Sequence, residues 1–211
     1  MTGLLIKDLR LFKHQGRYYL VVIALCCVLQ FFSTRDFSSF MTSYLSFMIV
    51  MYTFSSFSYD EYDNGMSFLM TLPCGRRAYV TEKYIFTVLL VTAGWVVGVV
   101  LRAAGYMSRF SMEGYRKILA EDPIYLLLVL IYAGCSIPAL IWFGAEKGRT
   151  AMLLGVGILA FLVYAVMKSG IRIPLADAEP GLLLMVLLIL CILVLGISYR
   201  ASVCLMEKKE F

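Results

Sequence analysis

Side chains that could catalyse a reaction or bind a metal ion are few in this chain and poorly placed for either. There is a single histidine, His14, and no two cysteines have the CxxC spacing. We interpret the cysteines as small buried hydrophobic residues, with a disulfide framework or a zinc site as the alternative. They are Cys26, Cys27, Cys74, Cys135, Cys191 and Cys204. The sequence therefore predicts no catalytic residue, no metal site and no cofactor in this chain.

The chain also lacks the groups that would let it drive transport alone. No Asp, Glu, Lys, Arg or His lies between the ends of its long apolar runs, whereas proton-coupled transporters place such residues in the membrane as relays. It has no GxxxxGK[ST] phosphate-binding loop, so it cannot bind ATP in that way. Sodium coupling through carbonyl and hydroxyl groups stays open. If the chain moves a substrate uphill, the energy comes most simply from another polypeptide.

The elements that must hold these residues are membrane helices. Hydrophobic residues make up 61% of the 211 residues and charged residues only 16%, which is too few charges for a soluble domain. A helix that crosses about 30 Å of hydrocarbon needs about 20 mostly apolar residues. Six runs have or approach this length: 18–34, 37–59, 84–101, 124–145, 151–167 and 181–199. We expect one all-α, polytopic membrane domain over residues 1–211, with six transmembrane helices.

Lysine and arginine in the flanks of these runs predict the orientation of the chain. With six spans, 12 of the 19 basic residues lie on the side of the two termini and the remaining 7 on the other side. Both termini are therefore predicted to be cytoplasmic. The basic segment 102–122 on the outer side weakens this bias, and we interpret it as a possible site for a short helix on the outer membrane surface.

Residues 1–17 predict an amphipathic helix that lies in the membrane interface. At 3.6 residues per turn, Leu5, Leu9 and Phe12 fall on one narrow apolar arc. The opposite side carries Lys7, Arg10, Lys13, His14 and Arg17. Such a helix faces its cations toward anionic lipid headgroups. The alternative is a basic flank that only sets the topology.

The cytoplasmic segment 59–83, between the second and third runs, is long for a connection between neighbouring helices, which usually has about 2–8 residues. Asp60 and Glu61 precede a short predicted helix at 66–72, where acidic groups suit the positive end of the helix dipole, and Pro73 ends it. The apolar face of this helix consists of Phe68, Leu69 and Leu72. An exposed apolar face needs a cover: a partner protein, lipid or the chain's own helices.

The second apolar run, 37–59, mixes hydroxyl and aromatic side chains. In membrane helices such hydroxyls usually bond to their own carbonyls or across helices. The alternative is a lining for an amphipathic substrate, and its candidate residues are Tyr44, Phe47, Tyr52 and Ser55. In the third run, Gly94 and Gly98 form a GxxxG pair that favours close helix packing, either within the chain or between two copies.

Three stretches together carry a resemblance to a known family: the opening LLIKDLRLFK, the segment YDEYDNGMSFLMTLPCGRRAYVTEKY and the close YRASVCLMEKKEF. They resemble the type-2 permease family of ATP-binding-cassette (ABC) exporters. Within it, the chain is similar to the small six-helix subunits that include the permeases of staphylococcal phenol-soluble-modulin export. The similarity runs in order over essentially the whole chain.

The resemblance implies that two permeases, identical or paralogous, pair in a bacterial cytoplasmic membrane and that each sits on an ABC ATPase, which would bind ATP and Mg²⁺. The helix at 66–72 would be the coupling helix, and the loop at 146–149 a second contact. The implied coupling residues are Asp60, Glu61, Met66, Phe68, Leu69, Leu72, Arg76, Arg77, Glu146, Lys147 and Arg149. The implied substrate is amphipathic or hydrophobic, with peptides as the leading class. Membrane lipids are expected partners, and nucleic acid is not.

Two other function classes remain compatible with the residues. One is an ion-driven secondary transporter or channel, which needs no ATPase. The other is a non-transporting membrane subunit, such as an anchor or an immunity protein. The segment 59–83 argues against the first class, and the hydroxyl-rich second run argues against the second.

Overall fold

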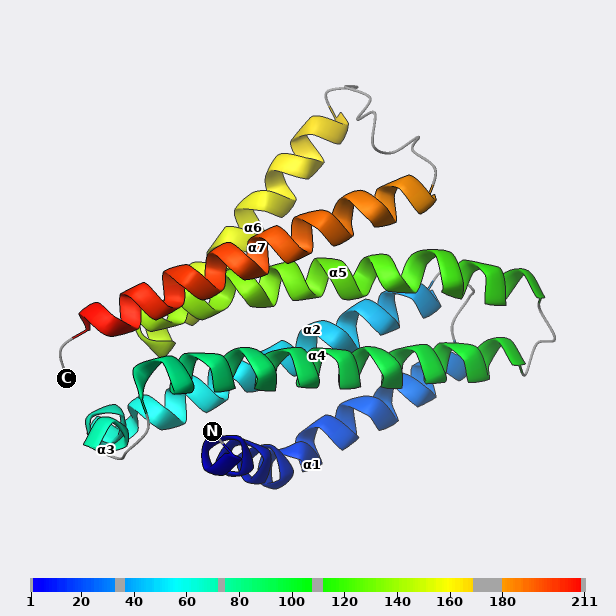
Figure 1. The fold of residues 1–211 in the computed structure, drawn as a ribbon. Helices are drawn as coiled ribbons and strands as arrows, with labels where there is room; N and C mark the ends of the chain where they lie inside the picture. Colours follow the sequence, from blue (N-terminus) through cyan, green and yellow to red (C-terminus); the bar gives the residue numbers. More distant parts are fainter. Residues whose placement is uncertain (1, 33–36, 72–74, 108–111, 169–179, 210–211) are drawn as a thin grey trace.

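The part of the chain that the structure describes is almost entirely helical. The computed structural model describes residues 2–32, 37–71, 75–107, 112–168 and 180–209, and these residues contain no strand. The long helices are α1 (Thr2–Phe32), α2 (Phe37–Glu61), α4 (Arg76–Met107), α5 (Met112–Phe143), α6 (Ala145–Lys168) and α7 (Pro180–Lys208). Between α2 and α4 lie a 3-10 turn (Tyr62–Asn64) and the short helix α3 (Gly65–Thr71). The predicted all-α fold is confirmed (Figure 1).

Among the described residues, three helices are long and apolar enough to cross a membrane. They are Arg76–Gly105 in α4, Ile118–Phe143 in α5 and Gly181–Lys208 in α7, which contain most or all of the third, fourth and sixth predicted spans. A shorter apolar helix, Gly16–Val28, lies in α1. The chain is therefore a membrane protein with several apolar helices. Helices α2 and α6, of 25 and 24 residues, cover the second and fifth predicted spans.

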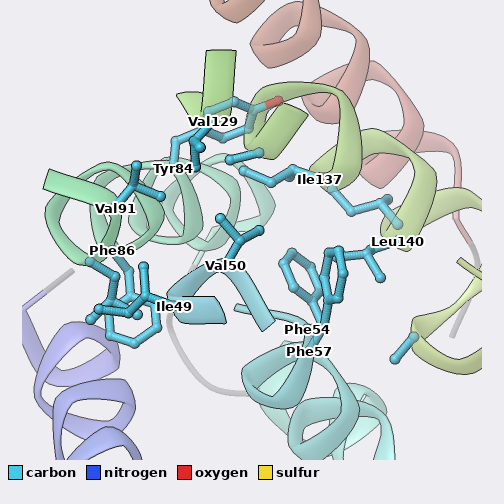
Figure 2. Close-up of a cluster of buried hydrophobic side chains, with 14 of the residues drawn as sticks. Ile49, Val50, Phe54, Phe57, Tyr84, Phe86, Val91, Val129, Ile137 and Leu140 are labelled. Carbon is cyan, nitrogen blue, oxygen red and sulfur yellow. The ribbon is translucent and has the colours of Figure 1, made fainter. Parts of the chain in front are cut away.

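Helix α2 lies at the centre of the bundle and packs against α1, α4, α5 and α6. Its side chains are buried on several faces for this reason. Figure 2 shows Phe54 and Phe57 of α2 directed toward Leu140 of α5, while Ile49 and Phe86 lie on the α4 side. All five side chains are at most 2% exposed. The core is thus built mainly by α2, α4 and α5.

Helix α7 is far less enclosed. Only 11% of its most apolar stretch is buried within the chain, against 39% for α4 and for α5. Figure 1 shows α6 leaning away from the other helices. Faces of this kind suit lipid or another membrane helix.

The five described cysteines carry free thiols, and Cys74 lies outside the described residues. Cys26 and Cys191 are buried, as interpreted from the sequence, but Cys135 and Cys204 are exposed. Burial was therefore the wrong expectation for these two. Cys135 lies on an outward face of the apolar stretch of α5, which suits lipid, whereas Cys204 lies near the charged C-terminal end of α7, beyond the sixth predicted span.

The GxxxG pair of the third predicted span packs inside the chain. A Cβ atom on Gly94 would lie 3.0 Å from Ile49, and one on Gly98 would lie 3.0 Å from the Cα atom of Thr42. Both neighbours belong to α2. The two glycines therefore allow α2 and α4 to approach closely, which resolves the choice between internal packing and packing against a second copy.

The structure differs from the expected short outer helix in segment 102–122. Helix α4 continues to Met107 and α5 begins at Met112, so most of this segment prolongs two bundle helices. The reason is an ion pair: Arg102 of α4, only 1% exposed, binds the carboxylates of Glu121 and Asp122 on α5. Its charge is neutralised inside the protein instead of facing the membrane surface.

Candidate functional site at the α3 end

Helix α3 lies at the end of the bundle that also holds both termini (Figure 1). The chain reverses there through Asp63, whose φ of 51° lies in the left-handed region that short polar residues tolerate best after glycine. Gly65 then starts α3 so close to α2 that a Cβ atom would lie 3.0 Å from the carbonyl oxygen of Asp60. The segment predicted to be long and ordered is therefore a compact turn and helix.

Helix α3 divides its apolar side chains between the bundle and the outside. Met66 is buried, and Leu69 and Met70 pack against the core. Phe68 is 68% exposed. Leu72 lies outside the described residues. The sequence grouped Phe68 and Leu69 on one docking face, and the structure separates them: Phe68 is available to a partner, whereas Leu69 is largely taken up by the chain itself.

Behind α3 lies a buried ion cluster, which we define as Lys7, Asp8, Asp60, Lys83 and their hydroxyl partners. The Nζ atom of Lys83 lies 2.5 Å from Asp8 Oδ2 and 2.7 Å from Asp60 Oδ2. Lys7 pairs with Asp60 and lies 3.3 Å from Asp8 Oδ1. Helices α1, α2 and α4 are thus joined at one point.

Hydroxyl groups and aromatic rings also contact the ion cluster, as does the buried carboxyl group of Glu82 beside Asp8 and Lys83. Ser56 Oγ donates to Asp8 Oδ2 at 2.7 Å, and Tyr79 Oη donates to Asp60 Oδ2 at 3.0 Å. The ammonium group of Lys83 lies 5.3 Å from the ring centre of Phe57 and 5.2 Å from that of Tyr79, within the range of cation–π attraction. Lys83, at 0% exposure, therefore carries its charge in an enclosed and well-satisfied site.

The charges of the ion cluster hold Asp8 in its ionised form. Burial opposes ionisation, but the charge and hydrogen bond of Lys83, with smaller contributions from Lys7 and Ser56, outweigh it and lower the pKa of Asp8 below its ordinary value. Asp8 and Lys83 were not predicted as site residues. Lys83 was counted for topology and as part of the stretch that carries the family resemblance, and Asp8 is the single acidic residue in a basic segment. An acidic residue alone among basic ones was the feature of the sequence that could have indicated an ion pair here.

Glu61, the other predicted acidic residue, binds the start of α6. Its Oε2 atom accepts a hydrogen bond of 2.6 Å from the backbone N–H of Ala145, so it caps the positive end of that helix. Gly144, at φ +82°, makes the preceding turn, and a Cβ atom there would lie 3.2 Å from the same carboxylate oxygen. Asp60 and Glu61 therefore both serve contacts within the chain.

Arg76 and Arg77 likewise bind the chain's own C-terminal helix. Arg76 donates to the carbonyl oxygen of Glu207 at 2.6 Å, near the end of α7, where carbonyl groups lack helical partners. Arg77 Nε lies 2.8 Å from the Glu207 carboxylate. The predicted coupling arginines thus tie α4 to α7.

The second predicted contact, at 146–149, was expected to be a loop, and this was wrong. These residues form the first turn of α6, because the turn at Gly144 and the hydrogen bond from Ala145 to Glu61 start the helix at Ala145. Glu146, Lys147 and Arg149 are exposed and line a cavity of 500 Å³ together with Glu61 and Tyr62. This cavity connects the end of α2 with the start of α6. The first turn of α6 and the turn before α3 therefore border the same cavity at this end of the bundle.

The four candidate substrate-path residues of α2 face different neighbours. The ring of Phe47 lies 5.2 Å from that of Tyr132 on α5, whereas the ring of Tyr52 lies 5.2 Å from that of Phe12 on α1. Ser55 donates to the carbonyl oxygen of Met51 at 3.3 Å, and Tyr44 is partly buried against the core. The substrate path stays a prediction.

These features define a helical membrane protein with a short surface helix fixed to one end of its bundle. A model of the family described as ABC-2 family transporter protein matches residues 3–207 of the chain. The chain belongs to this family, and it is a membrane permease subunit of the ABC transporter type. No curated protein and no solved structure matches it.

Proposed function

We propose that this chain is the membrane-spanning subunit of an ABC exporter, with ATP and Mg²⁺ bound by a separate ATPase that docks on α3. The observation that carries the proposal is the placement of α3. In a chain of the ABC-2 family, this helix exposes an apolar ring, Phe68, at the bundle end that holds both termini. Tyr59 and Tyr62, which precede α3, are exposed as well, and grouped exposed apolar residues outside the membrane mark a surface for a partner.

The proposed topology has six spans, with both termini and α3 in the cytoplasm of a bacterial cell. Besides the three most apolar helices, α2 and α6 are 25 and 24 residues long, which corresponds to roughly 36 Å at 1.5 Å per residue and exceeds the hydrocarbon thickness of about 30 Å. The first turns of α1 are seen nearly end-on in Figure 1 while the bundle runs across the page. This direction suits a helix lying in the membrane interface.

The proposed docking surface combines α3 with residues 146–149 in the first turn of α6. Tyr59 and Tyr62, which precede α3, are 55% and 78% exposed. Tyr62 lines the same cavity as Glu146, Lys147 and Arg149. The ion cluster behind α3 links the end of α2 and the start of α4 to α1. Movement of an ATPase against α3 would pass to α2, which α3 contacts, and through the ion cluster to α1 and α4, as coupling between two states requires.

A second permease copy or a paralogue would cover part of the apolar surface of α6 and α7, and lipids the rest. We propose an amphipathic or hydrophobic substrate, with peptides as the class to test first.

The experiment is recovery of the tagged chain from native membranes in mild detergent, with identification of the ATPase that co-purifies. Phe68→Asp should abolish its recovery, because a charge replaces the exposed ring, whereas Phe68→Leu keeps an apolar side chain and should retain it. Size-exclusion chromatography checks that both variants fold. Leu69→Asp is a weaker test because Leu69 also packs against the core.

Two outcomes would count against the proposal in different ways. An ATPase recovered equally with Phe68→Asp would place the docking site elsewhere than on α3. No ATPase with the parent chain would favour an ion-driven carrier or a non-transporting subunit.

A further inference from the structure

A groove between α1, α2 and α4 is separate from the α3 end. It has a volume of 450 Å³, within the range of about 300–1,000 Å³ that small-molecule sites usually have. Its walls are apolar: Ile23 of α1, Ile49 of α2, and Ala93 and Val97 of α4. The α2 and α4 residues lie in predicted membrane spans. The interior of the groove is therefore suited to a hydrocarbon chain.

The α1 wall changes from charged to apolar along one face of the helix. Lys13 and Arg17, one turn apart and both exposed, line the groove at its start. Leu20 and Ile23 follow on the same face, as spacings of three and four residues require. Two cations therefore stand at one end of a hydrocarbon-lined channel.

The position of Lys13 and Arg17 indicates which kind of ligand would fit the groove. Arg17 is held by Tyr18, whose hydroxyl oxygen lies 3.1 Å from its Nη2 atom and whose ring centre lies 5.0 Å from the guanidinium carbon. Lys13 and Arg17 repel each other unless an anion lies between them. Leu20 and Val21, at 66% and 67% exposure, make the outer surface here apolar, so the groove opens toward lipid.

We propose that this groove binds one acyl chain of an anionic phospholipid, with the lipid phosphate between Lys13 and Arg17. In an anionic phospholipid a charged headgroup is followed by a hydrocarbon chain, which matches the sequence of two cations followed by apolar side chains along the α1 wall. The bound chain would fill the space between α1 and its two neighbours and fix the angle at which α1 leaves the interface. This site does not depend on which ATPase or substrate the permease uses.

The test is native mass spectrometry of the purified chain, reconstituted in nanodiscs of phosphatidylglycerol and phosphatidylcholine and then released into detergent. The parent should retain phosphatidylglycerol in preference to phosphatidylcholine. Lys13→Gln with Arg17→Gln should reduce that preference at least tenfold. Arg10→Gln, an exposed cation of the same helix that does not line the groove, is the matched control and should leave the preference unchanged.

A second variant tests the hydrocarbon part of the site. Ala93→Phe fills the groove and should lower retention of both lipids, while Ala104→Phe, an exposed alanine of the same helix outside the groove, should not. Equal retention by these two variants, or an unchanged preference in the double variant, would overturn the proposal. A parent chain that retains no lipid would also overturn the proposal, because the groove would then have another occupant. An Ala93→Phe variant that keeps its lipid but loses the mass of a dimer would overturn it too, because the groove would then bind a second copy of the chain.

Discussion

Helix α4 carries a fully buried cation near each end, and the two are held in different ways. Lys83 pairs with Asp8 of α1 and Asp60 of α2, so its charge joins three helices. Arg102 pairs with Glu121 and Asp122, which are neighbours on α5, so its charge joins two helices. Trp95 adds a hydrogen bond of 2.8 Å to the Asp122 carbonyl oxygen within the same pair of helices.

The difference shows how one type of interaction can serve two purposes. The ion pairs of Arg102 hold together α4 and α5, which follow one another in the chain. The ion cluster at Lys83 instead joins the two helices between which α3 lies, because Asp60 precedes α3 and Lys83 follows it. Through Asp8 it also includes the N-terminal helix α1. The α3 end is therefore the end at which an external push would be shared among helices.

The largest expected effect is that of Lys83→Met. This change leaves Asp8 and Asp60 buried with Lys7 as their remaining cation, and the loss of a partner from a buried ion pair costs about 3–5 kcal/mol. The free energy of unfolding in mixed micelles measures it, with the exposed Lys208→Met as control. A loss below about 1 kcal/mol would place the effect among ordinary substitutions and contradict the role of the ion cluster. ATPase recovery should fall as well.

Arg102→Met is expected to have a smaller effect, about 2–3 kcal/mol, because it strands only Asp122 in the interior. Glu121 is 38% exposed and can turn to water. The same unfolding measurement applies. The folded fraction should still bind the ATPase as the parent does. Loss of binding at normal stability would mean that both ends of α4 take part in coupling.

Acid should weaken the α3 end through Asp8. Because the pKa of Asp8 is lowered in the folded protein, the unfolded chain binds more protons as pH approaches the ordinary value of about 4. Stability from this group is therefore complete above that pH and is lost as pH falls through the folded pKa. Thermal unfolding between pH 3 and 7 tests this, and Asp8→Asn should be less stable at pH 7 but less sensitive to acid. Equal acid sensitivity in both proteins would assign the loss to other carboxylates.

The smallest effect is expected for Arg77→Gln. Arg77 and Glu207 form an exposed pair on the protein surface, and water screens such pairs strongly. The unfolding midpoint should not shift measurably, and the midpoints of the variant and the parent should remain equal when salt is added. A clear shift would show that the α4–α7 contact stabilises the bundle more than its exposure indicates.

The sequence was most informative where composition alone decides structure. Long runs without charged residues require helices in a membrane, since backbone groups have no water partners there, and the all-α fold and the short helix before Pro73 followed from local pattern. The direction in which individual side chains point could not be predicted from the local sequence pattern. Phe68 and Leu69 looked equivalent in the sequence, yet one is exposed and the other packs inward, because α3 lies against α2 on one side only.

The amino-acid sequence by itself determined that this is a helical membrane protein with a structured segment between the helices now seen as α2 and α4. Only the tertiary structure decided that Asp8, Asp60 and Lys83 meet, since they are separated by up to 75 residues. A flanking lysine in a sequence looks the same whether it faces water or two buried carboxylates. The physical reason is that charge pairing depends on distance and burial, which are set by the packing of helices far apart along the chain.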